Sequence, residues 1–100
     1  MALSILYSQL FADSLEEILR FYDERNGSDQ YSHKLMEKIS KKIQLLPTMP
    51  EIGRMSDFHG VRMLYIDNYC IDYQIRTDAI LVINIYSTLT DPGNKVFLKS

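Results

Sequence analysis

Residues Tyr69 to Arg76 alternate apolar and polar side chains without interruption. This period of two is typical of a β-strand with one buried face and one exposed face. The rest of the stretch Gly60–Asp91 also has the composition of strands, so we expect three consecutive antiparallel strands there. Because such a sheet buries one face against a second layer, the preceding half of the chain must supply that layer.

Two amphipathic helices are predicted in that half. In Gln9–Asn26 the apolar residues Phe11, Leu15, Ile18 and Tyr22 recur at helical spacing, with Leu19 on the same stripe. Ser8 can cap this helix, Asp13 begins an alternative capping signature, and Gly27 suits the left-handed position that ends it.

A second helix is expected from Ser28 or Asp29 to about Leu46, where Pro47 stops it. The first helix is acidic outside its stripe and the second is basic. We therefore expect the two helices to lie antiparallel, with attractive charge along the seam between them.

The predicted fold class is α+β: an N-terminal strand, an antiparallel helical hairpin, then a three-stranded antiparallel meander, with one sheet packed on two helices. Periodicity alone allows either strand or helix for residues 2–7. Residues 51–59 are expected to form a loop, and residues 93–100 are too short and mixed to assign. The whole chain, 1–100, reads as a single domain with its core in 3–92.

Composition narrows the function classes. The net charge of −2 counts against a protein that binds mainly nucleic acid. A single cysteine, Cys70, excludes an intramolecular disulfide and a multi-cysteine zinc site, and no histidine cluster has ligand spacing. We expect no cofactor, no metal and no membrane contact, and a cytoplasmic location.

The register between the first two strands of the meander decides which residues share a face. A two-residue turn at Asp67-Asn68 would place Arg62 opposite Tyr73, on the apolar side. A three-residue loop that includes Ile66 places Arg62 opposite Asp72 instead. Because burying an arginine against the helices is costly, we predict the three-residue loop, with Asn68 adopting a positive φ.

By the same reasoning a three-residue loop at 77–79 follows the second strand. The face of the sheet turned away from the helices, called here the free face, is then predicted to carry Arg62, Leu64, Cys70, Asp72, Gln74, Arg76, Val82, Asn84, Tyr86 and Thr88. This mixed surface suits a protein partner better than a phosphate backbone. Cys70 is interpreted as an inert small residue there, and Tyr86 as the tyrosine most suited to a function.

The order of these elements resembles a known family. The residues that carry the resemblance are the SLEEI core of the first helix, Leu46-Pro47 through Pro50 to Gly53-Arg54, Gly60-Val61-Arg62, the run from Tyr69 to Ile75, and Asp91-Pro92. Together they resemble the RelE/ParE superfamily, the toxins of type II toxin–antitoxin systems, over residues 3–92.

The resemblance implies one of two targets. RelE-like members cut messenger RNA in the ribosomal A site, with several basic residues and often a tyrosine on the free face. ParE-like members lack that set and inhibit DNA gyrase. Carried over by position, one RelE-type cation falls on Arg62, but two RelE-type arginines fall on Cys70 and near Thr88. The histidine or arginine that commonly follows the last strand of ParE-like members is also absent.

These substitutions favour the ParE-like branch: a toxin for plasmid stabilisation or growth inhibition that binds gyrase without catalysis, neutralised by a cognate antitoxin. The resemblance implies that an amphipathic segment of the antitoxin lies on the helical hairpin and extends toward the sheet, where it could add a strand. Direct nucleic-acid binding is not expected. The candidate partner-binding residues are Arg54, Arg62, Asp72, Arg76, Asn84, Tyr86 and Thr88. The alternatives are a ribosome-dependent endoribonuclease using Arg62, Arg76 and Tyr86, and a degenerate member that only binds antitoxin.

Overall fold

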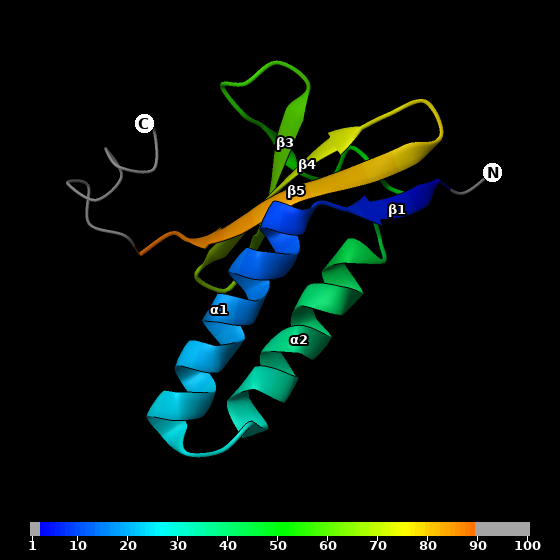
Figure 1. The fold of residues 1–100 in the computed structure, drawn as a ribbon. Helices are drawn as coiled ribbons and strands as arrows, with labels where there is room; N and C mark the ends of the chain where they lie inside the picture. The colour runs from blue at the N-terminus through cyan, green and yellow to red at the C-terminus, as the bar shows by residue number, and fades with distance from the viewer. Residues whose placement is uncertain (1–2, 90–100) are drawn as a thin grey trace.

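The computed structural model describes residues 3–89. Its elements are β1 (Ser4–Tyr7), α1 (Gln9–Asn26), α2 (Gln30–Ile43), β2 (Arg54–Met55), β3 (Val61–Ile66), β4 (Tyr69–Ile75) and β5 (Ala79–Ser87). The strands form one sheet in the order β1-β5-β4-β3-β2, and the helices lie together on one side of it (Figure 1). The predicted α+β class is therefore confirmed, as is the antiparallel meander β3-β4-β5.

The sheet is mixed and has one strand more than predicted. β1 pairs with β5 in parallel, so the N-terminal segment is a strand at one edge. β2 lies within the segment 51–59 that was expected to be a loop, and it pairs with β3 through Arg54–Met63 and Met55–Arg62. A strand this short carries no periodicity, so the sequence contained no signal for it.

The caps of α1 are as predicted. The Ser8 hydroxyl oxygen accepts a hydrogen bond from the Phe11 amide, and Gly27 ends the helix with a φ of 68°. α2 begins after Asp29, whose side chain makes no capping bond, and its regular part ends at Ile43. The predicted end near Leu46 lies in the turns that follow.

The seam between the helices is held by a polar contact and apolar packing. The Ser32 hydroxyl is a hydrogen-bond donor to the Leu19 carbonyl, at 3.1 Å, and to the Asp23 carboxylate. The ion pairs of residues 3–89 join Arg20 to Glu16, His33 to Asp29 and Lys38 to Asp67, none of which crosses the seam. The expected attraction between the helices is thus not realised as ion pairs.

The core lies between the helices and the sheet. Its largest fully buried side chains are Tyr73, Leu35, Ile39, Leu46, Ile71, Ile80, Ile85 and Val82. Cys70 is also fully buried, but on the other face of the sheet. Leu35 and Ile39 come from α2, and Leu46 comes from the turns that follow it. No helix in the described part of the chain is long and apolar enough to cross a membrane.

The predicted register between β3 and β4 is wrong. The turn has two residues, Asp67 and Asn68, and Asp67 takes the positive φ of 51°. Arg62 therefore lies opposite Tyr73, on the helix side of the sheet. The cost of placing a charged side chain on this side of the sheet is offset by hydrogen bonds. The Arg62 guanidinium donates to the Gly53 carbonyl at 2.9 Å and to the Glu51 carbonyl at 3.4 Å.

The predicted register between β4 and β5 is wrong at one end and right at the other. The turn is again two residues long, since Ile75 pairs with Ile80 and the Arg76 amide donates to the Ala79 carbonyl. Val82 consequently faces the core, where it is fully buried, instead of the free face. A register shift between Asp72 and Tyr73 makes Ile83 an extra residue and returns Asn84 to the face of Asp72.

Candidate partner-binding surfaces

The corrected register defines what the free face carries. Rows of paired residues cross it: Arg54, Met63, Asp72 and Asn84 in one, Tyr65, Cys70 and Tyr86 in the next, and Val61, Gln74 and Leu81 in a third. Sequence reasoning missed Arg54's neighbour Met63, as well as Tyr65, Val61 and Leu81, because each depended on the register. The free face is more apolar than predicted and has lost Arg62.

Asp72 lies at the centre of this face, within a small polar cluster. The Tyr86 hydroxyl donates to Asp72 Oδ1 at 3.1 Å, and the Cys70 thiol lies 3.9 Å from the same oxygen. Burial raises the pKa of Asp72, and the hydrogen bonds from Tyr86 and Cys70 partly oppose that rise. Burial likewise raises the pKa of Tyr86 above its ordinary value.

Cys70 is a packed residue of this cluster. It is 1% exposed, and burial raises the pKa of its thiol. A buried thiol with a raised pKa holds little of the reactive thiolate form at neutral pH. The interpretation of Cys70 as inert agrees with this geometry.

The other predicted site residues are dispersed. Arg76 Nε donates to Gln74 at 3.2 Å, at the far end of β4. Both the amide and the hydroxyl of Thr88 donate to the Asn68 carbonyl, at 2.7 and 2.9 Å, so Thr88 secures the end of β5. Arg54 is exposed on the edge strand β2.

The three residues of the predicted nuclease site do not come together. Arg62 lies on the opposite face from Tyr86. Arg76 is six positions along β4 from Cys70, the partner of Tyr86, which is roughly 20 Å of extended chain. The structure instead brings together Asp72, Asn84 and Tyr86.

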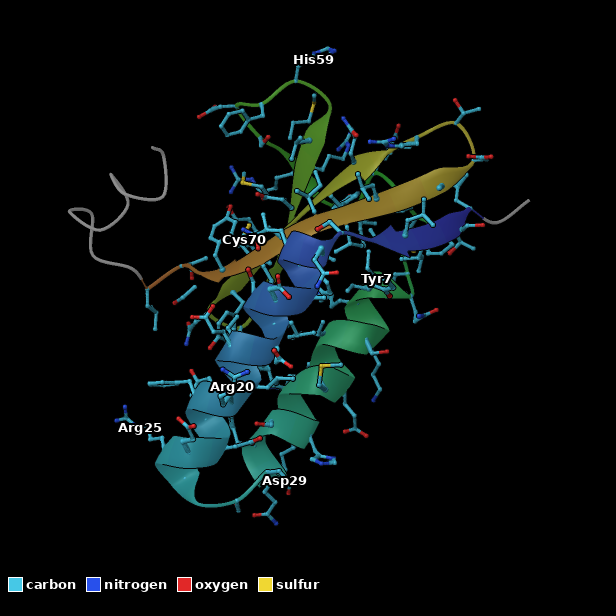
Figure 2. The ribbon with its side chains drawn as sticks, in the orientation of Figure 1. Tyr7, Arg20, Arg25, Asp29, His59 and Cys70 are labelled. Atoms are coloured by element: carbon cyan, nitrogen blue, oxygen red, sulfur yellow. The ribbon has the colours of Figure 1, made fainter. Side chains whose placement is uncertain are left out.

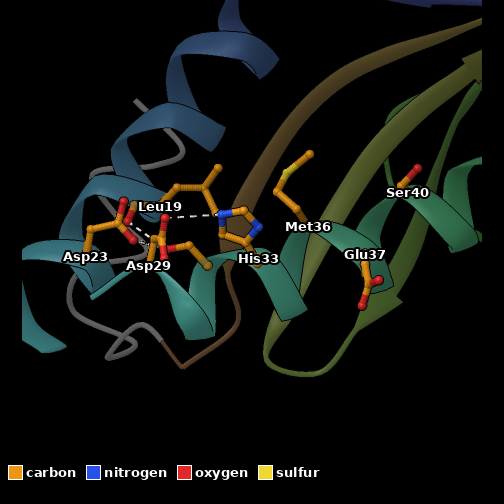
Figure 3. Close-up of a pocket in the computed structure, with 8 residues that line it drawn as sticks. Leu19, Asp23, Asp29, His33, Met36, Glu37 and Ser40 are labelled. Carbon is orange, nitrogen blue, oxygen red and sulfur yellow. Dashed lines mark hydrogen bonds and ion pairs between the residues drawn. The ribbon is translucent and has the colours of Figure 1, made fainter. Parts of the chain in front are cut away.

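A second surface lies on the helical hairpin. A groove of about 750 Å³ runs between α1 and α2, and its apolar lining includes Phe11, Leu15, Leu19, Met36 and Ile39. It continues into a hollow of about 470 Å³ that shares Leu19 and Met36 and is shown in Figure 3. Figure 2 marks both surfaces, with Cys70 on the sheet and Arg20 and Asp29 on the hairpin.

The borders of this groove are acidic. Four carboxylate side chains line the two hollows: Glu16, Asp23, Asp29 and Glu37. Among the lysines and arginines of the described residues, only Arg20 lines them. Arg20 also pairs with Glu16 at 3.2 Å, which leaves an excess of negative charge. The resemblance had led us to expect an antitoxin segment on the helical hairpin, and this groove lies there. Which residues border the groove was not predicted, because that depends on how the two helices pack.

One end of the groove meets the open edge of the sheet. Tyr7 of β1 lines the groove and is 50% exposed. The amides of Ser4 and Ser8 donate to Asp78 and Val82 beside β5, so the backbone groups of Ile5 and Tyr7 between them point to the open edge. A chain leaving the groove at Tyr7 therefore meets the open outer edge of β1, whose other edge is paired with β5.

Comparison with solved structures supports this fold. The "Chromosomal ParDE TA system from P. aeruginosa" matches with a TM-score of 0.77 and 20% identity, covering 86% of this chain and 96% of that chain. The "RelB-RelE antitoxin-toxin complex from Methanococcus jannaschii" matches at 0.59 and 12%, covering 94% and 96%. The "E. coli DinJ-YafQ toxin-antitoxin complex" matches at 0.57 and 11%, covering 87% and 93%. No protein of curated function gives a significant sequence match.

The fold is thus that of the RelE/ParE-like toxins. The model of the family "ParE toxin of type II toxin-antitoxin system, parDE" matches residues 5–92. The chain belongs to this ParE toxin family. The resemblance read from the sequence, and its preference for the ParE branch, are confirmed.

Proposed function

We propose that this ParE-family toxin inhibits growth by binding a protein target, DNA gyrase, and that a cognate antitoxin neutralises it through the helical groove. Two observations support the proposal: the chain belongs to the ParE toxin family, and the centre of its free face holds no cluster of cationic side chains among the described residues. Arg62 faces the other way, and a carboxylate, Asp72, occupies the middle of the sheet.

This arrangement argues against a nuclease. Cleavage of RNA by 2′-hydroxyl attack needs a base, an acid and cations that stabilise the developing charge. On the free face of residues 3–89, Arg54 lies on the edge strand and Arg76 beyond the end of β4, so neither is near Tyr86. A negatively charged centre would also repel the phosphate backbone.

The groove indicates what the antitoxin segment looks like. A helix that fits it presents an apolar stripe to Leu15, Leu19 and Met36 and carries basic side chains toward the acidic borders. Where such a segment leaves the groove beside Tyr7, it can add a strand to the open edge of β1. The supporting solved structures include complexes of a toxin with its antitoxin.

Expression of the toxin without its partner tests the target. The proposal expects DNA damage with intact messenger RNA, because gyrase inhibition acts on DNA topology. Rapid arrest of translation with cleavage of messenger RNA in the ribosomal A site would contradict it and favour the nuclease alternative. Co-expression of the cognate antitoxin is the control, and it should restore growth.

Substitution in the groove tests the antitoxin site. Met36→Glu places a charge in the apolar lining, so we expect it to weaken antitoxin binding about tenfold or more, measured by calorimetry. Met49→Glu is the matched control, because Met49 is 48% exposed in the turns after α2 and outside the groove lining. Equal affinities for the two variants would refute the groove assignment.

A further inference from the structure

The centre of the free face combines an unpaired charge with apolar surroundings. Asp72 is half-buried between Met63 on β3 and Asn84 on β5. Tyr65, on the neighbouring row, is 42% exposed, and Leu81 belongs to the next row. The carboxylate is therefore surrounded by side chains that a protein partner could cover.

The hydrogen-bonding capacity of Asp72 is only partly used. Tyr86 and Cys70 both direct their donors to Oδ1, and none of the ion pairs of residues 3–89 includes Asp72. Next to it, the buried Oδ1 of Asn84 has no hydrogen-bond partner within the described range. An ionised carboxylate has about four acceptor positions, so Asp72 can take further donors.

Covering this face makes that unused capacity costly. A carboxylate removed from water without a partner loses much of its hydration free energy, whereas an arginine or lysine placed against it recovers much of that loss. A partner that brought only apolar groups, or a phosphate, would leave the carboxylate unpaired or repelled. The chemistry of the face therefore selects a cationic side chain with apolar neighbours.

We propose that the free face around Asp72 is the docking surface for the target, and that the target is a protein that inserts an arginine or lysine side chain there between apolar groups. This deepens the proposed function, since it names the face and the chemistry of the partner. It assigns the two surfaces to different partners, the groove to the antitoxin and the free face to the target.

A short peptide tests the chemistry of the face independently of any toxin activity. Acetyl-Leu-Arg-Leu-amide is titrated into the isotope-labelled full chain and followed by amide chemical shifts. Acetyl-Leu-citrulline-Leu-amide is the uncharged, isosteric control. We expect the arginine peptide to shift amides of β4 and β5 and to bind there about tenfold more tightly than the control.

Two variants locate the effect. Asp72→Asn keeps the acceptor for Tyr86 but removes the charge, so it should abolish the preference for arginine at β4 and β5. Glu37→Gln, on the border of the helical groove, should leave that preference unchanged. Equal binding of the two peptides at the sheet, or an unchanged preference in Asp72→Asn, would overturn the proposal.

Growth assays assign the surface to the target. Asp72→Asn should need about tenfold more expressed toxin for growth arrest, with antitoxin affinity unchanged and the melting temperature not lowered. Asp72→Glu retains the charge and should recover part of the toxicity. An Asp72→Asn variant that stays fully toxic but loses antitoxin affinity would overturn the assignment. If the wild-type toxin arrests growth without affecting gyrase, only the choice of gyrase fails.

The chain itself supplies a rival occupant. Residues 90–100, outside the described part of the chain, contain Lys95 and Lys99 around Val96, Phe97 and Leu98. A variant ending at Asp91 separates the two possibilities in the peptide titration. Binding that is unchanged by truncation supports an external partner, and binding seen only after truncation would show that this segment is the occupant and overturn the proposal.

Discussion

Tyr73→Phe is the most informative test of how the loop before β2 is held against the core. The Tyr73 side chain is fully buried, and its hydroxyl donates to the Pro50 carbonyl at 2.6 Å and accepts from the Gly53 amide at 2.9 Å. It joins the loop before β2 to the core. Phenylalanine would keep the ring and its packing but leave both backbone groups without their partner.

The magnitude follows from those two bonds. A buried donor or acceptor left unsatisfied costs about 1–3 kcal/mol, so the variant should lose about 2–3 kcal/mol in its free energy of unfolding. A domain of this length has about 5–15 kcal/mol in total. At about 4–8 °C per kcal/mol, the melting temperature should fall by roughly 8–24 °C.

Urea denaturation and calorimetry measure the loss, with Tyr65→Phe as the matched control. The Tyr65 hydroxyl contacts two sulfur atoms, that of Met63 at 3.6 Å and that of Cys70, and its side chain is 42% exposed. Its removal should change stability by less than about 0.5 kcal/mol. A Tyr73→Phe variant as stable as Tyr65→Phe would refute the reasoning, because the loop would then not depend on these bonds.

Three further changes test particular contacts. Arg62→Met keeps the apolar stem but removes the donors to the loop carbonyls; it should cost about 1–2 kcal/mol in urea denaturation, whereas a free-face Arg62 would give almost no loss. Gly27→Ala meets no atom within 4 Å but must hold a φ of 68°, so its cost should be about 1 kcal/mol, with Ser28→Ala as the neutral neighbour. Asp72→Asn should be more stable than wild type at neutral pH. Because burial raises the pKa of Asp72, the native state binds its proton more readily than the unfolded state, and wild-type stability falls as pH rises above the ordinary value of 3.8. The advantage of the variant should disappear below that pH, and an advantage independent of pH would contradict the burial of the charge.

Local patterns were sufficient for the helices and for four of the five strands. Ser8 and Gly27 mark the ends of α1 through backbone chemistry that involves only neighbouring residues. The alternation around Tyr73 identified β4 in the same way. Such features depend on a few adjacent positions, so sequence reasoning reaches them.

The register failed because it depended on distant partners. Arg62 was expected on the free face because burying an arginine is costly when nothing accepts its hydrogen bonds. In the structure the Gly53 and Glu51 carbonyls do so, and both belong to a segment read as a plain loop. A cost estimated for one side chain is unreliable when its acceptors lie elsewhere in the chain.

The wrong register misplaced some of the residues predicted on the free face, but not all of them. Asn84 and Tyr86 were placed on the free face correctly because the extra residue Ile83 compensates for the shorter turn before β5. Val82, on the near side of that irregularity, was misplaced for the same reason. Bulges have no reliable sequence signal, so residues on either side of one must be assigned from the structure.

The most direct test of the account uses purified components side by side. The toxin is added to gyrase with relaxed plasmid, and separately to ribosomes translating a defined messenger RNA, each with and without antitoxin. We expect loss of supercoiling, reversed by antitoxin, and intact messenger RNA. Cleavage of the messenger RNA with normal supercoiling would contradict the account, because the centre of the free face holds the carboxylate of Asp72 and not a cation.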